Sequence, residues 1–256
     1  MRSIEDFRNK LQNGDKLIGG AITLSEIMSA EIVAHFMDFL WIDMEHGALD
    51  IGTVEGQILM AKKNRKPALV RVPKLDTAWI KMVLDAGAHG VIVPQVYSAE
   101  EVRRAVENAR YFPVGKRGYG PRLPNVYGEL GSGAEYIHWA NKNIYLAIQL
   151  ETKEAYEQLD SILEIDGYDA LCIGPADLAL SLGYHGEYSS APMTDILSVI
   201  IPKIKRAGKD VGFGMAFNLD YAKIALKMGV DWLQIASDFD FIGLMAKRIM
   251  QDLKKV

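Results

Sequence analysis

Residues 171–180, Leu-Cys-Ile-Gly-Pro-Ala-Asp-Leu-Ala-Leu, run from an apolar segment into a Gly-Pro break, and a carboxylate, Asp177, stands just past the break. The residues that follow have the pattern of the first turn of a helix. An apolar strand that ends in such a turn is where an α/β enzyme usually places its chemistry. Asp is also a common N-cap of a helix, so Asp177 alone decides nothing. The segment favours an α/β fold, and the question is whether other strands end in the same way.

Outward from this segment, short apolar runs alternate with longer amphipathic segments along the chain. The predicted strands are 17–22, 39–43, 68–72, 91–93, 144–150, 170–173, 211–214 and 232–236. The predicted helices are 25–35, 53–63, 76–85, 98–110, 152–159, 175–182, 194–207, 219–228 and 241–253. Eight strand–helix repeats in 256 residues predict one α/β domain over residues 1–256, a (β/α)8 or TIM barrel. A doubly wound sheet is the alternative, but it rarely needs eight repeats.

The alternation is interrupted at residues 111–141, which are rich in Gly, Pro, Tyr and Arg. A loop of this length in a compact domain is usually functional or disordered. We interpret it as an insertion over the active face, with some helix near residues 134–139.

Composition excludes several classes of partner. The net charge is −4 and the sequence contains no basic block, which argues against nucleic acid as a partner. Cys172 is the single cysteine, so no internal disulfide can form, and a reducing cytoplasm is the expected location. The first residues do not form a secretory signal, and no apolar run is long enough to span a membrane. Because no electropositive group flanks Cys172 in sequence, we expect a buried core residue rather than a catalytic thiol.

Polar residues stand at the ends of several predicted strands. In a barrel of this kind catalytic groups come from the C-terminal ends of different strands, so these residues are expected to converge near the barrel axis. They are Asp43, Glu45 and His46 after the second strand, Arg71 in the third, Gln149 and Glu151 at the fifth, and Asp177 after the sixth.

Glu151 and Asp177 follow consecutive strands and are predicted to be neighbours. Two carboxylates without a close basic partner repel each other, and a divalent cation would relieve this repulsion. Oxygen ligands suit Mg²⁺ or Mn²⁺, with Co²⁺ and Zn²⁺ as alternatives. The competing interpretations are a helix cap for Asp177 and a first-turn acid, favoured by the helix dipole, for Glu151.

Arg71 ends an apolar strand, where a charge is costly unless it is paired. Its planar fork suits a carboxylate or an oxyanion of a substrate, and the alternative is a salt bridge to Glu151 or Asp43. Asp43 and His46 could form a carboxylate–imidazole pair in which Asp43 orients the ring and raises its basicity.

Six short motifs together resemble the HpcH/HpaI-type aldolase/citrate lyase family. They are WIDMEHG at 41–47, RVP at 71–73, LDAGA at 84–88, VIVP at 91–94, QLET at 149–152 and IGPADL at 173–178. The resemblance extends from about Gly19 to Ser237, and its specificity lies in the order and spacing of the motifs. Members of this family are class II, metal-dependent pyruvate aldolases, such as 4-hydroxy-2-oxoheptanedioate and 2-keto-3-deoxy sugar-acid aldolases.

The resemblance implies a barrel of the phosphoenolpyruvate/pyruvate type and a set of catalytic roles. Glu151 and Asp177 would hold the divalent metal, which the 2-oxo acid would chelate. Arg71 would contact the keto oxygen of pyruvate. His46, oriented by Asp43, would help a metal-bound water to act as the base.

The resemblance also implies how the substrate is bound and how subunits assemble. The backbone at Gly174, Pro175 and Ala176 would bind the pyruvate carboxylate, and Gln149 would line the same pocket. Asp85 would approach the site from a neighbouring subunit of a homo-oligomer, a hexamer by resemblance. The loop at 111–141 departs from the sugar-acid aldolases, so we expect it to contact the aldehyde.

The leading functional interpretation is a lyase that reversibly cleaves a 4-hydroxy-2-oxo acid to pyruvate and an aldehyde through a metal-bound pyruvate enolate. A Schiff-base mechanism is disfavoured, because no lysine ends strands five to seven. Two alternatives stay open. One is a carbon–carbon lyase acting on malyl- or citramalyl-CoA, with Lys116, Arg117 and Arg122 as the candidates for binding CoA phosphates. The other is a non-catalytic barrel that binds 2-oxo acids.

Overall fold

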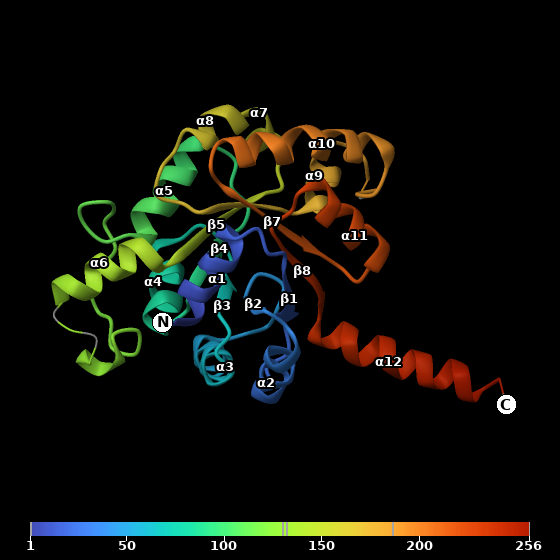
Figure 1. Cartoon of the computed structure of the whole chain (residues 1–256), viewed down its shortest axis with the longest axis horizontal. Helices are drawn as coiled ribbons and strands as arrows, with labels where there is room; N and C mark the ends of the chain where they lie inside the picture. The colour runs from blue at the N-terminus through green and yellow to red at the C-terminus, as the bar shows by residue number, and fades with distance from the viewer. Residues whose placement is uncertain (1, 130, 132, 186, 256) are drawn as a thin grey trace.

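The computed structural model of the chain describes residues 2–129, 131, 133–185 and 187–255. Within these residues, eight parallel strands form a closed barrel in which each strand pairs with the next one along the chain and β8 pairs with β1. Helices surround this barrel, as Figure 1 shows. The predicted (β/α)8 fold is therefore confirmed.

The strands coincide with the eight predicted apolar runs, and their ends differ from the prediction by at most one residue. They are β1 (Leu17–Ile22), β2 (Phe39–Asp43), β3 (Ala68–Arg71), β4 (Gly90–Val93), β5 (Tyr145–Leu150), β6 (Ala170–Ile173), β7 (Asp210–Met215) and β8 (Trp232–Ser237). Strands of a parallel barrel are buried on both faces, which is why they can be read as continuous apolar runs.

The helices follow the prediction less closely. They are α1 (Arg2–Gln12), α2 (Ile27–Phe36), α3 (Ile51–Lys63), α4 (Thr77–Asp85), α5 (Ala99–Ala109), α6 (Gly133–Asn143), α7 (Lys153–Glu157), α8 (Leu159–Leu163), α9 (Pro175–Ser181), α10 (Ala191–Arg206), α11 (Leu219–Met228) and α12 (Asp238–Leu253), with a 3₁₀ turn, η1, at Val126–Gly128. Asp76 and Ser98 cap α4 and α5 through their side chains, as expected. The predicted helix 152–159 is two short helices, and α1 was not predicted.

The core has two layers. Inside the barrel, large aromatic side chains pack against one another, including Phe39, Trp41, Tyr145 and Trp232. A larger apolar layer lies between the strands and the surrounding helices. Cys172 belongs to the inner layer, and burial raises its thiol pKa well above the ordinary value. Its predicted role as a core residue is confirmed.

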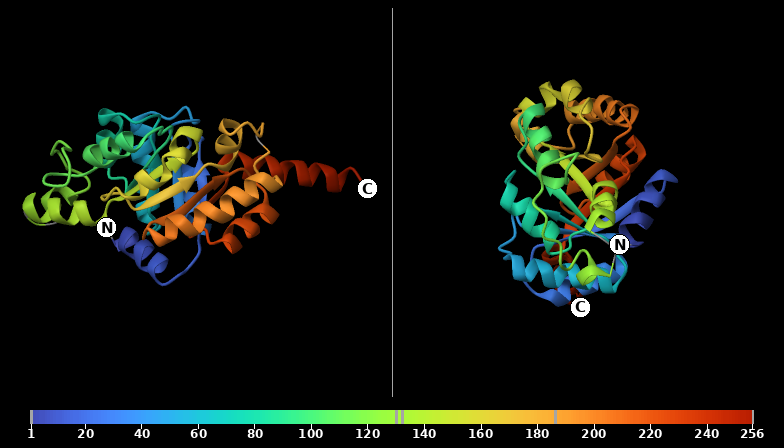
Figure 2. Two further views of the ribbon diagram at one scale, coloured as in Figure 1. Left: turned by 90° about the horizontal axis from the view of Figure 1, so that it is seen from above. Right: turned by 90° about the vertical axis from the view of Figure 1, so that its left-hand side faces the viewer.

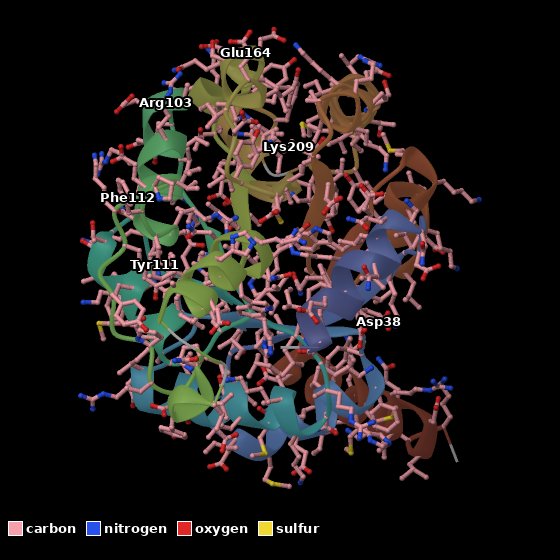
Figure 3. The ribbon with its side chains drawn as sticks, turned by 60° about the vertical axis from the view of Figure 1, so that its left-hand side comes forward. Asp38, Arg103, Tyr111, Phe112, Glu164 and Lys209 are labelled. Atoms are coloured by element: carbon pink, nitrogen blue, oxygen red, sulfur yellow. The ribbon has the colours of Figure 1, made fainter. Side chains whose placement is uncertain are left out.

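Helix α1 covers the N-terminal end of the barrel. The Arg8 guanidinium donates to the Asn143 and Ile144 carbonyls and to the Asp169 carboxylate. Arg110 binds the other oxygen of Asp169 at 3.0 Å. Figure 3 looks towards this end and shows α1 and α6 in front, with Tyr111 and Phe112 beside α5. The N-terminal end is therefore closed by a helix and by buried ion pairs.

The predicted position of the loop at 111–141 over the active face is wrong. The loop follows α5 and precedes β5, so it lies at the N-terminal end of the strands, and Trp139 of α6 donates to Glu5 of α1 at 2.9 Å. Figure 2 shows α6 and α12 at opposite ends of the molecule. In a (β/α)8 barrel the loops that carry chemistry follow strands, whereas loops that follow helices serve stability. The helix predicted near 134–139 is present as part of α6.

Helix α12 leaves the barrel after β8 and projects away from it (Figure 1). Asp238 at its first position is buried, and apolar side chains further along are exposed. These exposed side chains are Phe239, Ile242, Leu244, Met245, Ile249, Met250 and Leu253. Among the described residues, no helix combines the length and apolar character needed to cross a membrane.

Candidate active site

A cavity of about 490 Å³ opens at the carboxyl ends of the strands. Its wall includes seven of the residues that the sequence predicted for the site, Asp177 among them, and residues from β1, β7, β8 and α12 complete it. The predicted ones are Asp43, His46, Arg71, Gln149, Gly174, Ala176 and Asp177; the others include Thr23, Trp41, Met215, Ala216, Gln234, Ser237, Phe239 and Asp240. The convergence that strand order predicted is therefore present.

Arg71 is held by a buried pair of hydrogen bonds to Asp43. Parallel pairing of β2 with β3 places the two residues side by side. Nε donates to Asp43 Oδ1 at 2.9 Å and Nη2 to Oδ2 at 2.5 Å, and the guanidinium lies over the Trp41 ring. Burial opposes the charge, but the contact with Asp43 and the charge of Glu45 outweigh it, so the pKa of Arg71 is raised. Of the two salt bridges considered from sequence, the one to Asp43 is formed.

The structure does not bring the Asp43 carboxylate to the His46 ring. Asp43 Oδ1 accepts from the backbone amides of Glu45 and His46, and both of its oxygens bind Arg71. The carboxylate recorded beside the ring is that of Glu45, whose Oε2 lies 3.8 Å from His46 Nε2. The orienting role predicted for Asp43 is thus not what the geometry shows, because Arg71 occupies that carboxylate.

Glu45 is a site residue to which sequence reasoning gave no role. Its Oε2 lies 2.9 Å from Arg71 Nη1, and its side chain is 11% exposed. Burial raises its pKa, and the charges of Arg71 and His46 act in the opposite direction. Its position two residues after Asp43, in the turn that leaves β2, was the available signal.

Glu151 is almost fully buried at the end of β5, directly beneath the cavity wall. Its Oε1 accepts the Gln95 amide at 2.6 Å, and its Oε2 accepts Gln149 Nε2 at 2.5 Å. The pKa of Glu151 is raised to about 7: burial is the largest cause, the charges of Glu45 and Asp177 act in the same direction, and the Gln95 hydrogen bond opposes them. Gln95 donates from a left-handed backbone conformation (φ 53°), a strained geometry that the sequence does not reveal.

Asp177 and Gly174 occupy the turn from β6 into α9. Gly174 is the N-cap of α9 and Asp177 lies in the first turn, exposed to the cavity, so the helix-cap interpretation of Asp177 is wrong. Glu151 precedes Thr152, the N-cap of α7, so it is not a first-turn acid either. A Cβ at Gly174 would lie 2.9 Å from Glu151 Oε2, which explains glycine at this position.

The residues present fit a divalent cation. Glu45 and Asp177 are close enough for their negative charges to raise the pKa of Glu151, and Arg71 acts in the opposite direction. A cation bound by Glu151 and Asp177 would remove this repulsion. Among the described residues, no three Asp, Glu, His or Cys side chains group as a metal site by themselves. Two protein ligands would therefore need substrate and water oxygens to complete the shell.

Asp85 is not part of the cavity of its own chain. It ends α4 at the opposite end of the barrel, where Oδ1 lies 2.6 Å from Nη2 of the fully buried Arg117 side chain. Pro175 is the first residue of α9, between two residues that line the cavity. Any contact of Asp85 with an active site would therefore have to involve another copy of the chain.

Comparison with known proteins gives the same picture. The HpcH/HpaI aldolase/citrate lyase family model matches residues 22–242. A hydroxypyruvate/pyruvate aldolase from Roseovarius nubinhibens is 33% identical over 97% of this chain and 95% of its own length. A 4-hydroxy-2-oxo-heptane-1,7-dioate aldolase from Klebsiella pneumoniae is 36% identical over 95% of this chain and 91% of its own.

A solved structure agrees with these sequence matches. The HpcH/HpaI aldolase from Desulfitobacterium hafniense superposes with a TM-score of 0.91 at 28% identity, covering 97% of this chain and 96% of that one. The family and the aldolase type of enzyme predicted from the motifs are thereby confirmed. The chain belongs to the HpcH/HpaI aldolase/citrate lyase family.

Proposed function

We propose that the protein is a class II pyruvate aldolase that reversibly cleaves a 4-hydroxy-2-oxo acid to pyruvate and an aldehyde. The observation that carries the proposal is the arrangement of Glu151 and Asp177, two carboxylates without a full counter-charge, next to Arg71 at one end of the barrel. The names of the curated relatives support the same reaction type.

A cation bound by Glu151 and Asp177, Mg²⁺ or Mn²⁺ by ligand type, would supply a Lewis acid at the 2-oxo group. The substrate carboxylate would lie at the backbone of Gly174 to Ala176. The choice of Mg²⁺ or Mn²⁺ rests on the oxygen ligands alone, because the names of the relatives do not identify an ion.

Arg71 would bind the 2-oxo oxygen as negative charge develops there. Three of its five N–H groups donate to Asp43 and Gln149, and Glu45 Oε2 lies 2.9 Å from Nη1 as an ion-pair partner. Nη1 and Nη2 each keep one N–H that makes no hydrogen bond within the described residues. A guanidinium fixed by two carboxylates needs little reorganisation when charge appears, which is how preorganised donors accelerate such steps.

His46 would move the proton of the C4 hydroxyl. Its side chain is 65% exposed and lines the cavity, so a water can connect the ring to the substrate. In the cleavage direction the hydroxyl proton leaves, the electron pair of the broken O–H bond forms the second C4–O bond of the aldehyde, and the C3–C4 pair forms the enolate. A proton added at C3 then gives pyruvate.

A Schiff-base mechanism and a lyase acting on a CoA thioester receive less support. No lysine lines the cavity within the described residues, so nothing there could form a Schiff base. Lys116 and Arg117, proposed for CoA phosphates, are paired with Glu107 and Asp85 at the other end of the barrel. The aldolase is therefore the function that the site supports best.

The test is pyruvate release from 4-hydroxy-2-oxo acids with Mg²⁺ or Mn²⁺, before and after EDTA. We expect turnover that disappears on chelation and returns when metal is added. Turnover that survives full chelation would refute the metal-dependent mechanism, and binding of pyruvate without any turnover would favour a non-catalytic barrel.

We also propose that the chain forms a homo-oligomer. The exposed apolar side chains of α12 and the position of Asp85, remote from its own cavity, support this. A hexamer and a cytoplasmic location remain predictions.

A further inference from the structure

The proposed aldolase must hold an aldehyde, and one wall of the cavity is left for it. Glu151, Asp177 and Arg71 take up the side formed by β3, β5 and β6. Part of the remaining lining comes from β2 and the turn after it, including His46, Gly47 and Ala48, and the rest comes from the ends of β1, β7 and β8 and from the start of α12. We call this the β8 wall, defined by Thr23, Ala216, Gln234, Ser237 and Asp240.

The β8 wall carries negative charge and no basic side chain. Arg71 and His46 are the basic residues among the described lining, and Arg71 is already engaged by Asp43 and Glu45 on the opposite side. The carboxylate of Asp240 is half-buried on the β8 wall. Its recorded hydrogen bonds, from the amide and the hydroxyl of Ser237, both use Oδ2. Oδ1 therefore remains available to accept a hydrogen bond from a ligand.

The other polar groups of this wall have mostly spent their donors. The Thr23 hydroxyl donates to Asp238 at 2.8 Å, and the Ser237 hydroxyl donates to Asp240 at 2.8 Å. Gln234 Nε2 donates to the carbonyl of Ala236 at 2.7 Å, and Ala236 adopts a left-handed conformation (φ 61°). The wall is thus rich in acceptors and poor in donors.

We propose that the aldehyde substrate of this enzyme is a short, neutral hydroxyaldehyde and not an aldehyde that carries a carboxylate or phosphate. Its hydroxyl would donate to Asp240 or to another acceptor of the β8 wall, whereas an anionic group would meet the Asp240 carboxylate. The basic side chains of the described lining, Arg71 and His46, already have acidic neighbours of their own chain. Like-charge juxtaposition of this kind discriminates against the wrong ligand. The relative named for a heptane-1,7-dioate acts on a substrate whose aldehyde half bears a second carboxylate, so the proposal distinguishes this chain from that relative.

The inference rests on the proposed aldolase function, and the experiment separates the two. Exchange of the pyruvate C3 protons with D₂O, followed by NMR in the presence of Mg²⁺ or Mn²⁺, requires no aldehyde and reports on enolate formation alone. Aldol addition of pyruvate is then measured with glyceraldehyde and lactaldehyde, and with succinic semialdehyde and glyoxylate. We expect kcat/KM to be at least about tenfold higher for the hydroxyaldehydes than for the acid aldehydes.

Two variants at the wall sharpen this test. Ala216 is exposed on the β8 wall, so Ala216→Lys adds a cation and Ala216→Gln is its uncharged control. We expect Ala216→Lys, and not Ala216→Gln, to raise relative activity on succinic semialdehyde about tenfold. Asp240→Asn removes the negative charge, so it should reduce the preference for hydroxyaldehydes over acid aldehydes. The asparagine oxygen can still accept the hydrogen bonds from Ser237. C3 exchange is measured in each variant.

The outcomes are distinct. Absence of C3 exchange in the wild type would count against the aldolase itself. Exchange combined with a preference for acid aldehydes would overturn the inference and leave the aldolase standing. Equal gains from Ala216→Lys and Ala216→Gln would also overturn it, because charge would then not decide the choice.

Discussion

At the scale of single residues, Arg71 shows how a buried guanidinium at the cavity wall is held in place by contacts within its own chain. Its guanidinium forms ion pairs with Asp43 and Glu45 and lies over the Trp41 ring. A buried guanidinium that loses a carboxylate partner, or a carboxylate that loses its guanidinium, is left with an uncompensated charge. Arg71 therefore contributes to the fold as well as to the proposed chemistry.

This double role decides which Arg71 variant is informative. Arg71→Ala would leave Asp43 and Glu45 unpaired, whereas Arg71→Lys keeps the charge and loses the planar fork. We expect Arg71→Lys to lower kcat about 100-fold while the circular dichroism spectrum stays that of the wild type. A rate within about twofold of wild type would contradict the role of the fork; the exposed Arg103→Lys on α5 serves as the control.

The metal-ligand role proposed for Glu151 predicts that metal binding depends on pH. Burial raises its pKa to about 7, so in the metal-free protein the side chain holds a proton below that pH and must lose it to bind a cation. Metal binding should therefore release about 0.9 proton at pH 6 and about 0.1 at pH 8 from this group. Affinity should fall about tenfold per pH unit below 7.

Isothermal titration calorimetry in two buffers of different ionisation enthalpy measures this proton release directly. Equal release at pH 6 and pH 8 would show that Glu151 does not control binding. Glu151→Gln is the matched variant, and it should abolish the pH-dependent part along with tight binding.

Residue-level prediction succeeded where strand order alone brings side chains together. Asp43, Arg71, Gln149 and Asp177 end neighbouring strands and meet as expected. The contacts of Glu45 depend on the path of a turn, and those of Gln95 depend on a left-handed backbone conformation. Neither can be predicted from the spacing of residues in the sequence.

At the scale of elements, the N-terminal end of the barrel is held by charges that the proposed chemistry does not use. Arg110, which caps the C-terminal end of α5, binds Asp169, Ile144 and Gly167 and is 3% exposed. Asp169 also binds Arg8 of α1, so one carboxylate connects α1 to α5. We therefore expect this network of ion pairs to stabilise the fold.

Removing Arg110 should therefore cost stability and leave catalysis intact. We expect Arg110→Ala to lower the free energy of unfolding by about 3 kcal/mol or more, since Asp169 loses a buried partner. The control, Arg103→Ala on the same helix, removes an exposed side chain and should stay within about 0.5 kcal/mol of wild type. Denaturant titration measures both, and kcat of the folded Arg110→Ala protein should match wild type; a stable variant with a lost rate would contradict this assignment.

Elements were predicted well where burial makes the pattern strong and less well where direction matters. The strands are apolar on both faces and stand out. Helix α1 was missed although Ile4, Phe7 and Leu11 follow the helical spacing of a buried face. The length of the loop at 111–141 suggests a functional role, but length does not indicate the end of the barrel at which a loop lies. Its position after α5 and before β5 decides this and places it at the N-terminal end.

At the scale of the whole molecule, α12 is the feature that a lone chain leaves unexplained. Its apolar side chains extend into solvent away from the barrel (Figure 1), and a monomer rarely exposes such a surface. We expect light scattering after gel filtration to give a mass that is a multiple of 28.4 kDa. Ile249→Glu should shift the mass toward that of one chain, and Lys247→Glu on the same helix should not.

A wild-type mass of one chain would refute the homo-oligomer. An unchanged mass for Ile249→Glu would instead place the interface away from α12. Turnover measured on the same samples would show whether assembly is needed for activity, as the position of Asp85 implies.

The closure of the barrel by α1 has a consequence for the timing of folding. Arg8 is synthesised before its partners Asn143, Ile144 and Asp169, and β1 is synthesised before β8. Contacts so distant along the chain form slowly, because a long loop must close before they stabilise anything. During synthesis the apolar face of α1 is therefore not fully covered until β5 and β8 have been made, and such transiently exposed apolar surface makes a nascent chain prone to aggregate.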